Sequence, residues 1–191
     1  MIVKKLSAVL LCTVFALKGS AQKIIRNYGF EWFDVGGKLI SWLPQNTKGQ
    51  YLILPSLTGH SGFGSVLITP KPEAPAERGS GLCNTHLAQN MVSGKKTIRV
   101  TGFIKTEGLA NGVASIWMQL NGIGAIIADK NSDAQSAQGN SDWKKYSIEL
   151  PISGNVQSVV FGCKMTGTGK AWFDDFEVFI DDAPVQELFT P

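Results

Sequence analysis

The chain has 191 residues, of which 17% are charged and 43% are hydrophobic, and its formal net charge at pH 7 is +3. Lys4, Lys5 and Lys18 lie in an N-terminal segment with the pattern of a cleaved signal, so that 15 of the 18 basic residues remain against 15 acidic ones. A balanced chain without a basic run lacks the patch that nucleic-acid or membrane-surface binding requires, so we expect neither partner.

The first 21 residues have the order of a secretory signal peptide. Charged residues come first, an apolar run extends from Leu6 to Leu17, and small residues follow up to Ala21. This run is too short to anchor the protein in a bilayer. Leu11 is also too bulky to precede Cys12 in a lipoprotein signal. We therefore predict that residues 1–21 are removed and that the protein is exported to the bacterial periplasm or beyond, without a membrane anchor.

Residues 22–191 are predicted to form one domain, because about 170 residues is the ordinary size of a domain with its own core. Cys83 and Cys163 remain in it. Both lie in apolar, strand-like runs, which favours a buried pair over a nucleophilic thiol. An oxidising compartment permits a disulfide between them, and the sequence leaves open whether the pair is bonded or reduced.

Alternating polar and apolar residues indicate many short strands and no long helix. Two clear examples, residues 98–105 and 114–121, are separated by the turn-prone segment 108–112. Further strands are predicted at residues 51–54, 65–69, 82–88, 125–128, 143–150, 156–165 and 170–180. The proline-rich segment 70–81 and the polar segment 131–141 are predicted to be surface loops. The fold class is therefore all-β, an antiparallel β-sandwich, and within that class we favour a jelly roll.

Three segments, read in order, resemble a known group of domains. They are Asn27-Tyr-Gly-Phe-Glu31, Gly139-Asn-Ser-Asp-Trp-Lys-Lys-Tyr146 and Gly169-Lys-Ala-Trp-Phe-Asp-Asp-Phe176. This order is similar to that of galactose-binding-domain-like jelly rolls, which include many carbohydrate-binding modules. His60-Ser-Gly62 also resembles the N-terminal domains of secreted bacterial peptidases and esterases. Without such an enzyme, the domain is expected to act alone or with a partner.

The resemblance implies a structural calcium ion. In such modules the opening glutamate and the aspartate pair of the last strand hold this ion, and here they correspond to Glu31, Asp174 and Asp175. Calcium prefers six to eight oxygen ligands, which carboxylates and loop carbonyls provide. The alternative is that Glu31 caps a turn and that the two aspartates are solvated at a strand edge.

A sugar-binding face needs a flat aromatic ring and side chains that make paired hydrogen bonds to hydroxyl groups. Trp117 is the best candidate, because it alternates with Gln119 on the polar side of its strand. If the preceding strand pairs with this one, Phe103 and Lys105 line the same surface. The resemblance adds Trp42 at the edge of such a surface. The alternative is that a loop covers Trp117.

The remaining tryptophans, Trp32, Trp143 and Trp172, are predicted to pack in or against the core, because they belong to or follow the three motifs. Tyr51 is placed with Trp42 at a binding edge by the resemblance alone.

An enzyme is not favoured. His60 and His86 are the only histidines, and neither lies in a Gly-x-Ser-x-Gly or His-Glu-x-x-His motif. A dispersed Ser-His-Asp set has no sequence signature and stays open. Adjacent residues of a strand point to opposite faces, so Asp174 and Asp175 are expected to be a poor acid and base pair.

We therefore predict a secreted, non-catalytic binding module that recognises a glycan or glycoconjugate. The alternative is a structural or protein-interaction domain whose partner is a secreted or cell-envelope protein. A small glycan-acting enzyme, such as a lyase or an esterase, comes third.

Overall fold

The structure is a computed structural model that describes residues 26–75, 79–133 and 136–185. The signal peptide predicted over residues 1–21 lies outside these ranges. Ten strands and one short helix follow in chain order: β1 (Leu43–Asn46), β2 (Tyr51–Ser56), β3 (Ser65–Pro70), β4 (Gly81–Ala88), α1 (Gln89–Val92), β5 (Thr97–Asn121), β6 (Ile126–Asn131), β7 (Ala137–Pro151), β8 (Ser158–Met165), β9 (Thr168–Ile180) and β10 (Ala183–Pro184). No helix within these ranges is long and apolar enough to cross a membrane.

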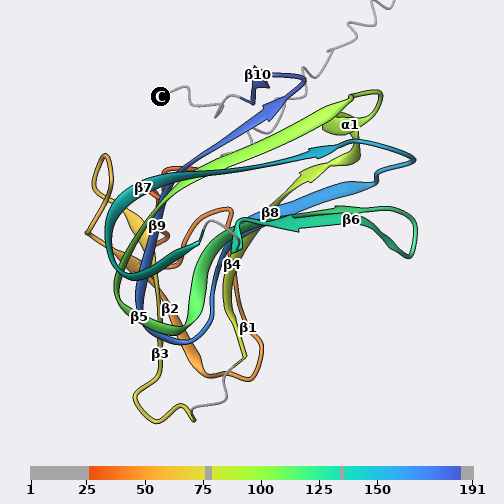
Figure 1. The fold of residues 1–191 in the computed structure, drawn as a ribbon. Coiled ribbons are helices and arrows are strands. Elements are labelled where there is room, and N and C mark those ends of the chain that lie inside the picture. Colours follow the sequence, from red (N-terminus) through yellow and green to blue (C-terminus); the bar gives the residue numbers. More distant parts are fainter. Residues whose placement is uncertain (1–25, 76–78, 134–135, 186–191) are drawn as a thin grey trace, which may run out of the picture.

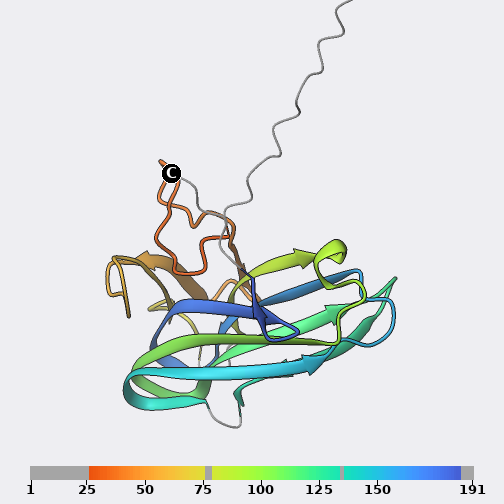
Figure 2. The same ribbon diagram turned by 90° about the horizontal axis from the view of Figure 1, so that it is seen from above.

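The strands form two antiparallel layers that share one strand, β5 (Figure 1). Its second half pairs with β8 and β6, and these strands with β4 and β1 make the layer that we name sheet I. Its first half pairs with β7 and β9, and these strands with β3 and β2 make sheet II. Figure 2 shows both layers from above, with the segment before β1 projecting from them. The predicted all-β jelly roll is confirmed.

The alternation in β5 decides which side chains enter the core. Outside the irregular segment 107–113, its even-numbered residues face the core, and Ile104 in sheet II and Ile116 and Met118 in sheet I are fully buried between the layers. The odd-numbered residues consequently point outward, because successive side chains of a strand lie on opposite faces.

The turn predicted for residues 108–112 is wrong, because β5 runs through this segment without interruption. The strand instead changes register between Glu107 and Ala110. Gly108 and Asn111 adopt positive φ angles of 60° and 54°, which glycine and asparagine tolerate better than other residues. These irregularities bend the strand and let it pass from sheet II to sheet I.

The core between the layers contains an aromatic cluster. Trp42 lies 4.5 Å from Phe30, 5.2 Å from Phe176 of β9 and 6.1 Å from Phe161 of β8, measured between ring centroids. Trp42 is only 3% exposed, and its indole N–H donates to the Asn27 carbonyl at 2.7 Å. Trp42 therefore belongs to the core and is not the exposed aromatic ring expected at a binding edge.

Other aromatic predictions have mixed outcomes. Tyr51 is 2% exposed and donates its hydroxyl to the Gly167 carbonyl, so it too lies in the core. Trp172 is buried as predicted. Trp32 is 45% exposed, so the prediction that it packs in the core is wrong. Residues 131–141 are only partly a loop, because β6 ends at Asn131 and β7 begins at Ala137.

Cys83 of β4 and Cys163 of β8 stand directly opposite each other, and both are fully buried as free thiols. The Cys163 thiol donates to the Cys83 carbonyl at 3.5 Å. Burial raises the pKa of the Cys163 thiol well above its ordinary value. A thiol that resists ionisation is a poor nucleophile, so this pair has a packing role.

Candidate functional site

The residues predicted to bind a ligand lie on two opposite outer faces. Trp117 and Gln119 point outward from sheet I, on the half of β5 that pairs with β8. Phe103 and Lys105 point outward from sheet II, where β5 pairs with β9 and β7. The two halves of β5 do not pair with each other, so the predicted common surface does not exist.

Trp117 belongs to a row of side chains that crosses sheet I. Trp117 stands opposite Asn131 of β6 on one side and Gly162 of β8 on the other, and the row continues to Asn84 of β4 and Leu43 of β1. Residues in register on neighbouring antiparallel strands present their side chains to the same face. Because Gly162 has no side chain, nothing of β8 separates Trp117 from Asn84 in this row.

Only glycine fits at residue 162. A Cβ atom there would lie 2.0 Å from the Cys83 carbonyl oxygen, which is far inside van der Waals contact. The close approach of β4 and β8 therefore keeps this position free of a side chain. Sequence reasoning missed Gly162 and Asn84, although a glycine within an apolar, alternating strand is a signal of close backbone approach.

Trp117 is partly buried and borders a shallow hollow of about 280 Å³ with Gln119, Asp129 and Lys164. The indole N–H of Trp117 and the amide nitrogen of Asn84 are buried and have no hydrogen-bond partner within the described ranges. A buried donor without an acceptor costs about 1–3 kcal/mol. The row thus has donors that its own side chains do not satisfy.

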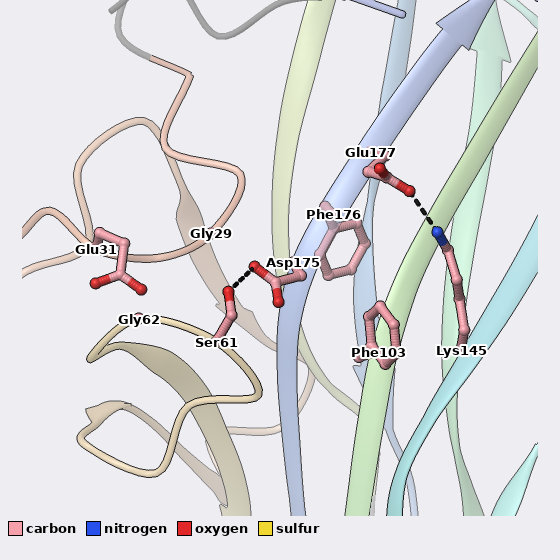
Figure 3. Close-up of a pocket in the computed structure, with 9 residues that line it drawn as sticks. All are labelled: Gly29, Glu31, Ser61, Gly62, Phe103, Lys145, Asp175, Phe176 and Glu177. Atoms are coloured by element: carbon pink, nitrogen blue, oxygen red, sulfur yellow. Dashed lines mark hydrogen bonds and ion pairs between the residues drawn. The ribbon is translucent and has the colours of Figure 1, made fainter.

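The opposite face carries a loop, residues 57–64, that is bound to the last long strand. The backbone N–H of His60 donates to Asp174 at 2.7 Å, and that of Ser61 donates to the same oxygen at 3.4 Å. Asp175 accepts from the Ser61 hydroxyl at 2.9 Å (Figure 3) and lies 2.7 Å from Nδ1 of His60. We name this set of contacts the loop clasp.

Both aspartates reach the same loop because β9 is irregular there. Phe103 of β5 stands opposite Asp174, whereas Thr101 stands opposite Glu177, so β9 carries one extra residue between these two pairs. Asp175 has a φ angle of 46° within this irregularity. The expectation that Asp174 and Asp175 point to opposite faces is therefore wrong, since a bulge breaks the simple alternation of a strand.

Asp174 is fully buried. Burial and, secondarily, the charge of Asp175 raise the pKa of Asp174 to about 7, against the opposing effect of the N–H donors from His60, Asp175 and Ser61. Desolvation disfavours the charged carboxylate more than these donors favour it. The clasp thus contains a carboxyl group that titrates near neutral pH.

Glu31 joins the same loop from the opening motif. Its carboxylate accepts the backbone N–H of Phe63 at 2.9 Å and that of Gly64 at 3.3 Å. The three predicted calcium ligands therefore gather around one loop, and each accepts hydrogen bonds from that loop. Over the described ranges, no group of three His, Cys, Asp or Glu residues is placed to hold a metal ion. In this arrangement the three carboxylates hold the loop through hydrogen bonds.

Phe103 lines a hollow of about 420 Å³ together with Glu31 and the clasp residues Ser61 and Asp175 (Figure 3). His60 stacks on the Phe103 ring at 3.6 Å, and the ammonium group of Lys145 lies 5.6 Å from the ring centroid. Lys145 also pairs with Glu177. One flat face of Phe103 is thus covered by His60, and the charged groups nearby are already paired.

Lys105 and Trp143 are also engaged on this face. Lys105 pairs with Asp142 at 3.0 Å, and the Trp143 ring meets His60 edge-on at 5.8 Å. Lys105 is therefore not available as an unpaired donor to a ligand.

His60, Asp175 and Ser61 do not have the geometry of a nucleophilic triad. In such a triad the histidine accepts the serine proton and the aspartate orients the histidine. Here the Ser61 hydroxyl donates to Asp175 rather than to His60. The arrangement therefore holds the loop and does not activate the serine.

Comparison with solved structures places the fold among known domains. The module TmCBM61, solved with β-1,4-galactotriose, has a TM-score of 0.53 and 16% identity over 84% of this chain and 99% of its own. The CBM22-1 xylan-binding domain of Paenibacillus barcinonensis Xyn10C has a TM-score of 0.53 and 14% identity over 82% and 93%. The enzymatically active domain of bacteriophage CBA120 tailspike protein 4 has a TM-score of 0.61 and 6% identity.

The tailspike match covers 81% of this chain, which spans only 21% of the tailspike chain. No protein-family model and no curated protein matches the sequence. Similarity at such low identity concerns the fold alone. The chain has the β-sandwich jelly-roll fold of the carbohydrate-binding modules, as its three motifs predicted.

Proposed function

We propose that this protein is an exported, non-catalytic module that binds a glycan or glycoconjugate on the outer face of sheet I around Trp117. The observation that carries the proposal is the row from Trp117 across Gly162 to Asn84. It places an indole ring on an outward face, and the β8 residue directly opposite this ring, Gly162, has no side chain.

The surroundings of Trp117 match the chemistry of a saccharide. A pyranose has an apolar side that packs on an aromatic ring and a rim of hydroxyl groups that donate and accept hydrogen bonds. Gln119, Asp129 and Lys164 line the hollow beside Trp117. The Gln119 amide nitrogen donates to Asn121 and Lys164 lies 3.9 Å from Asp133, whereas the Asp129 carboxylate forms no ion pair in the described parts of the chain. A single aromatic surface with a few polar groups is typical of a small-ligand site.

The outer face of sheet II supports glycan binding less well. The Phe103 ring already stacks on His60, and Lys105 and Lys145 are paired with carboxylates. A sugar ring would have to displace His60 and break the contact of its imidazole with Asp175.

The likeness to carbohydrate-binding modules supports the same class of ligand. The solved modules bind β-1,4-galactotriose in one case and xylan in the other, according to their descriptions. We extend only the class of ligand, a glycan, to this protein, because identities of 16% and 14% show a common fold and not a common ligand.

The proposal is tested by titrating the purified protein with soluble glycans in a calorimeter, beginning with galactan and xylan. We expect one glycan class to bind and Trp117→Ala to abolish the binding. Phe103→Ala is the matched control, since it removes an aromatic ring from the other face. Binding that survives Trp117→Ala contradicts the proposed face, and the absence of any glycan ligand favours a protein partner.

A catalytic role is tested on the same samples. We expect no new reducing ends, unsaturated products or released acyl groups after long incubation with each glycan. Product formation that His60→Ala abolishes would overturn the non-catalytic assignment.

A further inference from the structure

A second hollow lies at the open edge of the sandwich and continues the Trp117 row. It has a volume of about 790 Å³ and lies between β1, the edge of sheet I, and β2, the edge of sheet II. Its apolar lining comes chiefly from Leu39, Leu43, Ile53 and Leu54, and the largely buried Trp42 also borders it. We name it the edge groove.

The edge groove exposes aliphatic side chains to water. Leu43 is 60% exposed and Leu54 is 42% exposed, although both border a concave surface large enough for a small ligand. Exposed apolar side chains gathered around a groove indicate a site that another apolar group covers.

The row from Trp117 leads directly into this groove. Trp117, Gly162, Asn84 and Leu43 stand in register on four neighbouring strands, and Leu43 itself lines the groove. Three strand spacings separate Trp117 from Leu43, a distance of roughly 14 Å. A saccharide that lies on Trp117 and runs across the strands therefore ends at the mouth of the groove.

The groove is unsuited to a further sugar residue. Hydroxyl groups need hydrogen-bond partners when they leave water, and an aliphatic lining does not provide them. The apolar side chains outnumber the polar ones, which are Asp34, Lys38, Ser41, Thr85 and His86. Lys38 and His86 do not pair with a carboxylate in the described parts of the chain. An aliphatic chain would fill the groove and leave both side chains hydrated.

We propose that the ligand is a glycoconjugate whose saccharide lies on the Trp117 row and whose aliphatic chain occupies the edge groove. This inference rests on the proposed glycan function and narrows its ligand class. It assigns a binding role to Leu54, which lies outside the Trp117 row, and a contact with the aliphatic chain to Leu43, which ends this row.

The test compares a saccharide that binds with the same saccharide carrying an octyl chain, at concentrations below micelle formation. We expect the octyl form to bind about tenfold more tightly or better, because burial of aliphatic surface adds to the affinity. Leu54→Glu should abolish this gain and leave the affinity for the unsubstituted saccharide unchanged.

Leu57→Glu is the matched control, because Leu57 is 87% exposed and does not line the groove. It should leave the gain intact. Leu43→Glu is a second groove variant and should also abolish the gain from the octyl chain. Because Leu43 ends the Trp117 row as well, an unchanged affinity for the unsubstituted saccharide is expected of Leu54→Glu alone. A thermal melt of each variant verifies that the groove substitutions leave the fold intact.

The outcomes separate this inference from the proposed function. If Trp117→Ala abolishes saccharide binding but the octyl chain adds nothing, glycan binding stands and the groove inference is overturned. A gain from the octyl chain that Leu54→Glu and Leu43→Glu do not reduce also overturns it. If octanol binds in the groove while no saccharide binds anywhere, both the glycan function and the glycoconjugate fail.

Discussion

The outer faces of both sheets carry an aromatic ring with polar neighbours, but these neighbours are paired to different extents. Both sheets present an aromatic ring from β5, Trp117 on sheet I and Phe103 on sheet II. On sheet II the polar neighbours bind one another, through the loop clasp and through ion pairs such as Lys145 with Glu177. On sheet I, Gln119 and Lys164 also have partners, Asn121 and Asp133. The buried indole N–H of Trp117, however, has no acceptor among the residues that the structure describes.

This difference shows that an aromatic ring on a polar face does not by itself identify a binding platform. What matters is whether the surrounding donors and acceptors have already paired. On sheet II the pairing holds the loop 57–64 against β9 and covers Phe103. On sheet I no β8 side chain stands directly opposite the Trp117 ring, and a hollow borders this ring. Three changes break or sharpen this comparison.

The largest effect is expected at Gly162, on which the sheet I row depends. Gly162→Ala places a Cβ atom 2.0 Å from the Cys83 carbonyl and forces β4 and β8 apart. We expect a loss of about 3 kcal/mol in the free energy of unfolding, measured by urea denaturation. Gly29→Ala is the control, because its Cβ would have only ordinary contacts, at 3.5 Å or more. Equal stability of the two variants would contradict the close strand approach.

The second effect concerns the clasp on sheet II. The pKa of Asp174 is about 7 in the folded protein and 3.8 ordinarily, so the folded state binds the proton more tightly than the unfolded chain does. Asp174 therefore stabilises the fold most at low pH, and this contribution declines as the pH rises from about 4 to 7.

Asp174→Asn should remove this pH dependence. Between pH 5 and pH 7.5 we expect the wild type to lose about 1–2 kcal/mol more than the variant, after allowance for partial solvation of the site. Urea denaturation at both pH values measures the difference. Parallel pH profiles for the two proteins would mean that Asp174 does not titrate near neutral pH.

The smallest effect is expected from calcium. Because N–H and O–H donors of the loop already occupy Glu31, Asp174 and Asp175, calcium or EDTA should shift the melting temperature by less than about 2 °C. A larger rise with calcium that EDTA reverses would support the structural ion that the resemblance implies. It would also mean that the cation takes over the role of the clasp donors.

Much of the fold could be predicted because it follows from local patterns. Alternation separated the two faces of residues 98–105 and 114–121, which are the two halves of β5, and the three motifs indicated the jelly roll. The continuous β5 was missed because Gly108 and Asn111, which resemble a turn, instead adopt positive φ angles within a paired strand. The path of β5 from one sheet to the other is a tertiary property that no local window contains.

The site was less predictable for the same reason. Trp117 and Gln119 share a face by simple alternation, but their separation from Phe103 depends on which strands flank each half of β5. Trp42 looked available next to a polar loop, yet the layers close over it. The bulge at Asp175, which turns two adjacent aspartates toward one loop, also has no clear sequence signal.

The most direct test of the central claim is a calorimetric comparison of Trp117→Ala and Phe103→Ala with the wild type, using one glycan that the wild type binds. The account predicts that Trp117→Ala weakens binding by more than about tenfold, whereas Phe103→Ala changes it by less than about twofold. The opposite order, with Phe103→Ala weakening binding and Trp117→Ala leaving it unchanged, would place the glycan on sheet II and contradict the account.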